Sequence, residues 1–114
     1  MRNVVIASAA RTPVGTFNGA FSKIPAHDLG SVAIREAVKR SGIDSAEVSE
    51  TILGQVLTAG QGQNPARQAS MLSNLPEETS ALTVNQVCGS GLRSVAIGFQ
   101  SIACGQSEIV IAGG

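Results

Sequence analysis

One segment of the sequence, residues 85–93 (NQVCGSGLR), has residue types and spacing that could carry covalent chemistry. Cys88 stands between an apolar run and a predicted helix, so we expect it at the helix N-terminus. Unpaired backbone N–H groups and the positive end of the helix dipole favour a thiolate there. The thiolate is the nucleophilic form of cysteine. The pattern therefore predicts Cys88 as a nucleophile, with the same N–H groups stabilising an oxyanion and with Gly89 and Gly91 leaving room for a substrate.

Two other interpretations of this segment compete with the nucleophile. Free cysteine is among the most buried residue types, so Cys88 could be a small packed side chain at a tight turn. The spacing Gly89-x-Gly91 after a strand also resembles a dinucleotide fingerprint. The third glycine is replaced by Ser94, and Gly113-Gly114 stand where the acidic residue is expected. The sequence contains neither GxxxxGK[ST] nor GxSxG, so it offers no phosphate loop and no serine elbow.

The remaining cysteine and the single histidine are assigned no chemistry. Cys104 is predicted in the last turn of the same helix, where the dipole opposes a thiolate, and it is interpreted as a packing residue. If both cysteines belong to that helix they lie about 24 Å apart, too far for a disulfide. Free thiols fit a reducing, cytoplasmic setting. His27 lies near the start of another predicted helix and is interpreted as a surface or helix-start residue.

Alternating strand and helix patterns must position these residues. Asn64-Pro65 is a strong helix start, while Asp28 is a possible N-cap and Gly42 suits the left-handed position after a helix. Periodicity predicts strands at 4–9, 48–57, 81–87 and 109–112, and helices at 28–41, 64–74 and 92–104. The order βαβαβαβ predicts an α/β fold with a mostly parallel sheet and helices on both faces.

Composition and length exclude several classes of function. The chain has 114 residues, is 14% charged and carries no net charge, which argues against a nucleic-acid partner and a membrane surface. The apolar run at 4–10 is short for a signal peptide and is better explained as a buried strand. Because the sequence stops at Gly113-Gly114 directly after a predicted strand, we expect a fragment of a longer protein.

Four segments together resemble one family, the biosynthetic thiolases or acetyl-CoA acetyltransferases. They are VVIASAARTPVG at 4–15, ILGQVLTAGQGQNPARQAS at 52–70, VNQVCGSGLRS at 84–94 and IVIAGG at 109–114. The similarity covers the whole chain, in order and at the family's spacing. It implies a thiolase-like N-terminal half, with residues 1–114 forming an incomplete N-terminal thiolase domain.

The resemblance also implies a reaction. In such enzymes the cysteine that matches Cys88 takes the acetyl group from acetyl-CoA. The carbanion of a second acetyl-CoA then attacks the acyl-cysteine and forms acetoacetyl-CoA, and the reverse reaction is cleavage by CoA. The resemblance implies no metal or prosthetic group, a homodimer or homotetramer, and a place in fatty-acid metabolism.

The same resemblance locates the rest of the machinery outside residues 1–114. A His in a GHP segment and a second Cys in a CxGGG segment belong to the second half of family members, so we expect the isolated chain to be inactive. Arg67 or Arg93 could meet a CoA phosphate, although a surface or interface pair is favoured. By resemblance, the loop with Gln61, Gln63 and Asn64 helps to form a subunit interface.

Two alternatives stay open. Ketoacyl synthases and hydroxymethylglutaryl synthases also use a helix-start cysteine for acyl transfer, although the surrounding motifs fit thiolases better. The 114-residue piece could instead be a non-catalytic folding or interaction module with an open sheet edge.

Overall fold

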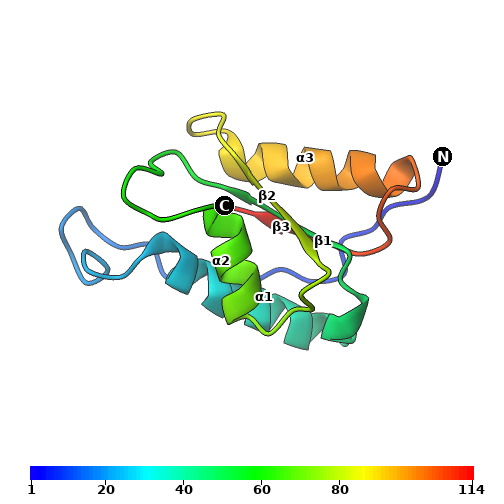
Figure 1. Ribbon diagram of the computed structural model, residues 1–114, viewed down its shortest axis with the longest axis horizontal. Helices are drawn as coiled ribbons and strands as arrows, with labels where there is room; N and C mark the ends of the chain where they lie inside the picture. The colour runs from blue at the N-terminus through cyan, green and yellow to red at the C-terminus, as the bar shows by residue number, and fades with distance from the viewer.

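A three-stranded parallel sheet between helices forms the centre of the protein, in a computed structural model that describes residues 1–114 (Figure 1). The strands are β1 (Glu50–Gly54), β2 (Ser80–Val84) and β3 (Val110–Gly113), in the spatial order β2-β1-β3. Helix α3 (Ser90–Ala103) covers one face of the sheet. Helix α2 (Pro65–Leu72) covers the other face, and α1 (Ala26–Ser41) packs against α2. A short 3-10 helix, Ser45–Glu47, precedes β1.

The parallel register brings the carboxyl ends of all three strands to one edge of the sheet. Gly54 of β1 pairs with Val84 of β2, and Leu53 pairs with Gly113 of β3. Helix α3 begins shortly after β2 ends, so its N-terminus lies at this edge (Figure 1). In open α/β sheets this edge is where ligands usually bind. The predicted α/β class with a parallel sheet is confirmed.

The three helices form where the apolar periodicity predicts them, with small shifts at their ends. In α3, however, the apolar stripe formed by Leu92, Val95 and Phe99 is exposed, and the buried residues are small: Ser90, Ser94, Gly98 and Ser101. The predicted N-cap Asp28 is wrong, because α1 already begins at Ala26 with Pro25 in the capping position and no side-chain cap. Asp28 instead lies in the first turn, where a carboxylate suits the helix dipole. Gly42 does end α1 in the left-handed conformation, with φ 70°. Helix α2 ends at Leu72, two residues early, because Asn74 has φ 58° and cannot continue it.

The predicted first strand, Val4–Ala9, is wrong for this chain. Residues 1–16 form no helix and no strand, and Val5 and Ile6 are each 81% exposed. The segment runs beside α1, where the Ser8 hydroxyl donates to the Ala37 carbonyl (2.6 Å) and Arg40 donates to the Ala9 carbonyl (2.9 Å). An apolar cavity of about 880 Å³ is lined by this segment, by α1 and α3, and by β3. A strand needs a neighbour for its ladder of hydrogen bonds, and residues 4–9 have none.

A small core and one polar cluster fix the helices on the sheet. Ile34, Val48, Ala69 and Leu75 form the buried apolar cluster between α1, α2 and the sheet. On the opposite face the carboxylate of Glu50 accepts hydrogen bonds from two serine hydroxyls, Ser101 (2.9 Å) and Ser107 (3.0 Å). The C-terminal part of α3 is therefore tied to the start of β1, which leaves its N-terminus at the end of β1.

Candidate active site

Cys88 lies in the short turn between β2 and α3, two residues before the first residue of the helix. Its thiol is free, and its side chain is exposed. The prediction that Cys88 stands at the N-terminus of a helix is confirmed. The competing interpretation, a packed cysteine at a tight turn, is wrong because the side chain faces solvent.

The turn itself is closed by backbone hydrogen bonds on both sides of Cys88. The Gly89 N–H donates to the Gln86 carbonyl (3.0 Å), and the Ser90 N–H donates to the Val87 carbonyl (3.2 Å). Val87, immediately before Cys88, has φ 50°. A β-branched residue in this left-handed region is strained, at a cost of about 1–3 kcal/mol. The other non-glycine residues with positive φ are all asparagines, which tolerate it: Asn18, Asn64 and Asn74.

Two polar side chains hold this strained turn. The hydroxyl of Ser90, a residue only 5% exposed, accepts from the Gln86 N–H (2.8 Å) and donates to the Val87 carbonyl (2.6 Å). The side chain of Asn85 accepts from the Val87 N–H (2.9 Å) and donates to the Val56 carbonyl (3.2 Å). The backbone before Cys88 is thus bonded to the first residue of α3 and to the loop that follows β1.

Gly54 allows the start of α3 to touch the end of β1. A Cβ atom at Gly54 would lie 2.5 Å from the Ser90 Cβ, 2.7 Å from the Ser90 carbonyl carbon and 2.9 Å from the Gly91 nitrogen. Only glycine permits this approach. Position 54 is therefore a glycine for a structural reason, which is its contact with the helix that follows Cys88.

Three backbone N–H groups at this helix start remain free. Those of Cys88, Gly91 and Leu92 donate to no acceptor in the chain, whereas those of Gly89 and Ser90 are used in the turn. Free N–H groups at a helix N-terminus attract negative charge. The site therefore combines an exposed thiol with unpaired donors that can stabilise an anion close to it.

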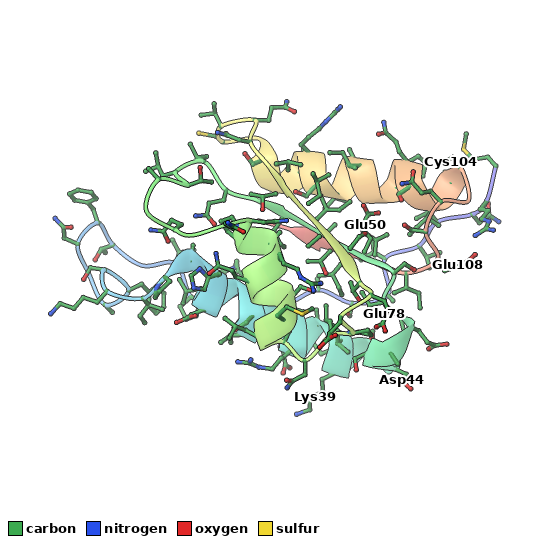
Figure 2. All side chains as sticks on the ribbon, viewed as in Figure 1. Lys39, Asp44, Glu50, Glu78, Cys104 and Glu108 are labelled. Atoms are coloured by element: carbon green, nitrogen blue, oxygen red, sulfur yellow. The ribbon has the colours of Figure 1, made fainter.

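The other residues singled out from the sequence lie elsewhere or have structural partners. Cys104 follows α3 at its opposite end and is exposed, so the prediction that it packs in the interior is wrong (Figure 2). Helix α3 ends at Ala103, so Cys104 is the residue that follows the helix rather than part of its last turn. His27 lies in the first turn of α1, with Nδ1 buried and unpaired and Nε2 3.6 Å from a carboxylate oxygen of Asp28.

The two arginines differ in their contacts. Arg67 donates to the carbonyls of Glu77 (3.1 Å) and Thr79 (3.0 Å), which gives it a structural role beside β2. Arg93 is exposed in the first turn of α3, and its guanidinium group has no hydrogen-bond partner in the chain. No group of three or more His, Cys, Asp or Glu side chains is placed to hold a metal ion.

The loop before α2 is organised by its own side chains. Gln68 donates to the carbonyls of Gln61 and Gln63, both at 2.8 Å. Asn64 caps α2 as predicted, because its side-chain oxygen accepts from the Arg67 N–H (3.2 Å). Asn64 also donates to the Ala81 carbonyl (3.1 Å), which joins this loop to β2. None of these side chains bonds to the turn that holds Cys88. None of the helices has the length and apolar character needed to cross a membrane.

The fold and this site define the class of protein. Residues 4–114 match the family model of the thiolase N-terminal domain, and the chain belongs to that family. Its structure is similar to a crystal structure of a thiolase from Ascaris suum in complex with coenzyme A, with a TM-score of 0.92 and 44% identity over 94% of this chain and 28% of that one.

Curated relatives carry more particular names. The chain is 60% identical to an acetyl-CoA acetyltransferase of Paracoccus denitrificans over 100% of its own length and 29% of the relative's. It is 58% identical to an acetyl-CoA acetyltransferase of Rhizobium meliloti (strain 1021), over 98% of this chain and 28% of the relative. A probable acetyl-CoA acyltransferase of Staphylococcus aureus (strain MRSA252) is 54% identical, over 100% of this chain and 29% of the relative. The chain thus spans less than a third of the length of these relatives.

Proposed function

We propose that this chain is the part of an acetyl-CoA C-acyltransferase that carries the acyl group, with Cys88 as the nucleophile. The observation that carries the proposal is the exposed Cys88 thiol at the start of α3, beside N–H groups that have no acceptor. The acetyl-CoA acetyltransferase and acyltransferase names of the relatives, and coenzyme A in the Ascaris suum thiolase complex, support the substrate class.

The proposed reaction has two acyl transfers. In the first, the Cys88 thiolate attacks the thioester carbonyl of acetyl-CoA, a carbon–sulfur bond to Cys88 forms, and CoA leaves as its thiolate. The free N–H groups at the helix start stabilise the negative oxygen of the tetrahedral intermediate. In the second, the carbanion of another acetyl-CoA attacks the acetyl-cysteine and expels the Cys88 thiolate. Two acetyl-CoA thereby give one acetoacetyl-CoA and one CoA.

Proton transfer in this scheme needs groups that residues 1–114 do not place beside Cys88. The only histidine, His27, belongs to α1, and the other cysteine, Cys104, lies at the far end of α3. We therefore assign the base that activates the thiol, and the base that removes the proton from the second acetyl-CoA, to the remainder of a longer protein. Residues 1–114 alone are then expected to show little or no turnover.

The remaining features of the proposal concern cofactors, assembly and location. The scheme uses CoA thioesters as substrates and requires no metal or prosthetic group. A homodimer or homotetramer of the complete enzyme, located in the cytoplasm, completes the proposal. Two free cysteines in the chain are compatible with such a reducing compartment.

The test is the intact mass of the protein after incubation with acetyl-CoA, for residues 1–114 and for the longer protein that contains them. We expect one acetyl adduct in the longer protein, lost in Cys88→Ala and retained in Cys104→Ala. The matched Cys104 variant controls for non-specific acetylation of an exposed thiol. An adduct that persists in Cys88→Ala would refute the assignment. An adduct in residues 1–114 alone would show that this part suffices for the first acyl transfer.

A further inference from the structure

We propose that Ser90 is a positioning residue for Cys88: its buried hydroxyl holds the strained turn that presents the thiol at the start of α3. This inference rests on the proposed role of Cys88 as nucleophile. Ser90 does not contact the thiol through any hydrogen bond. It acts through the two residues that precede Cys88.

The hydroxyl of Ser90 both accepts and donates a hydrogen bond, and both of its partners lie in the turn. It accepts from the Gln86 N–H at 2.8 Å and donates to the Val87 carbonyl at 2.6 Å, so its proton and one lone pair have fixed directions. Ser90 is 5% exposed, which keeps water from replacing either bond. An alanine at this position would leave the Gln86 N–H without an acceptor. The Val87 carbonyl would lose the hydroxyl at 2.6 Å and keep only the longer bond from the Ser90 N–H, at 3.2 Å.

The backbone that this hydroxyl holds would otherwise relax. Val87 has φ 50° although the residue is 63% exposed, so burial of its side chain does not explain the conformation. Strained backbone persists where surrounding contacts over-determine it, and it gathers at functional sites. Relaxation of Val87 to negative φ would rotate the peptide that leads into Cys88. The thiol would then leave its place beside the free N–H groups of the helix start.

Ser90 itself is anchored by the sheet. The Cβ and the carbonyl carbon of Ser90 are so close to Gly54 that a Cβ added at Gly54 would lie 2.5 and 2.7 Å from them. The first residue of α3 is therefore held against the end of β1. Its hydroxyl, through the bonds to Gln86 and Val87, fixes the turn relative to the sheet. The chain of contacts runs from β1 through Ser90 to Val87 and then to Cys88.

The experiment measures alkylation of Cys88 relative to Cys104 by iodoacetamide, in the longer protein that contains this chain. Each thiolate displaces iodide and gains a carbamidomethyl group. Arg93 lies between the two cysteines, so trypsin places them in separate peptides that mass spectrometry can follow. Both cysteines are exposed in residues 1–114, and Cys104 reports on reagent and pH within the same molecule. We expect Cys88 to react faster than Cys104, and Ser90→Ala to lower this ratio about tenfold, a change of about 1.4 kcal/mol in the barrier.

The control and the rescue use other residues of the same region. Ser94, also buried, donates only to the Ser90 carbonyl (3.0 Å), so Ser94→Ala should leave the ratio unchanged. Asparagine tolerates positive φ, as it does at Asn18, Asn64 and Asn74 in this chain. Val87→Asn should therefore restore the ratio in the Ser90→Ala background, because the turn no longer needs to be held against strain.

The outcomes separate the assignment of Cys88 as nucleophile from the positioning role of Ser90. A wild-type ratio near one would overturn the proposed nucleophile and this inference with it. A high wild-type ratio that Ser90→Ala leaves unchanged would overturn only the positioning role. If Ser90→Ala lowers the ratio or does not fold, the double variant Ser90→Ala, Val87→Asn decides. A restored ratio in the double variant supports the positioning role. A ratio that stays low, or a double variant that does not fold, shows that Ser90 is a structural residue only.

Discussion

Replacement of Gly54 by alanine tests whether the contact between β1 and α3 holds the site together. The added Cβ would meet three atoms at 2.5, 2.7 and 2.9 Å, and all three are backbone or Cβ atoms of Ser90 and Gly91 that no rotamer change can move. Overpacking of this kind costs about 1–3 kcal/mol, and rigid neighbours favour the upper end. Loss of a glycine within a strand returns about 0.5–1 kcal/mol through the unfolded state. We therefore expect Gly54→Ala to lower the free energy of unfolding by about 2 kcal/mol.

Urea denaturation followed by circular dichroism measures this loss. With an m-value of about 1–3 kcal/mol per molar urea, the midpoint should fall by about 1 M. Gly113→Ala is the matched control, because Gly113 stands at the same edge of the sheet and an added Cβ there meets nothing within 4 Å. Gly113→Ala should change the midpoint little or raise it. Equal stability of the two variants would refute the argument that Gly54 is required by close approach.

Three further predictions concern the framework around the site. Asn64→Ala removes the cap of α2 and its bond to β2, so the free energy of unfolding should fall by about 1–2 kcal/mol in urea titrations, and a loss under about 0.5 kcal/mol would contradict the capping role. Glu50→Ala leaves the buried hydroxyls of Ser101 and Ser107 without their carboxylate and should cost about 2 kcal/mol, whereas Glu108→Ala, which breaks an exposed pair, should cost under about 1 kcal/mol; similar losses would refute the ranking. Residues 1–114 alone should sediment as oligomers at micromolar concentration because the edge of β3 is unpaired, and a clean monomer would count against that expectation.

The helices and the position of Cys88 could be predicted because their signals are local. The apolar stripe of α3 and the Asn64-Pro65 start of α2 each depend on residues within a few turns. The same locality places Cys88 before a helix. Helix ends were less well predicted because backbone conformation decides them. Helix α1 begins after Pro25, upstream of Asp28, and the positive φ of Asn74 ends α2 before the predicted residue.

Features that depend on distant segments were not predictable. Residues 4–9 have a strand composition, yet a strand also requires a partner that this chain does not place beside them. Ser90 was missed because its role appears only when the turn folds back on it, although a serine directly after Cys88-Gly89 could have suggested a local side-chain bond. The exposure of Cys104 depends on where α3 ends relative to β3, which the apolar stripe does not reveal.

The unpartnered segment at residues 4–9 has a consequence for synthesis on the ribosome. It is uncharged, lacks proline and is rich in β-branched residues, a composition that favours aggregation when exposed. About 100 residues separate it from β3, which at 5–20 residues per second takes about 5–20 s to synthesise. Even then Val5 and Ile6 remain exposed beside an apolar cavity. Residues 4–9 therefore give the nascent chain a segment suited to a chaperone during this time.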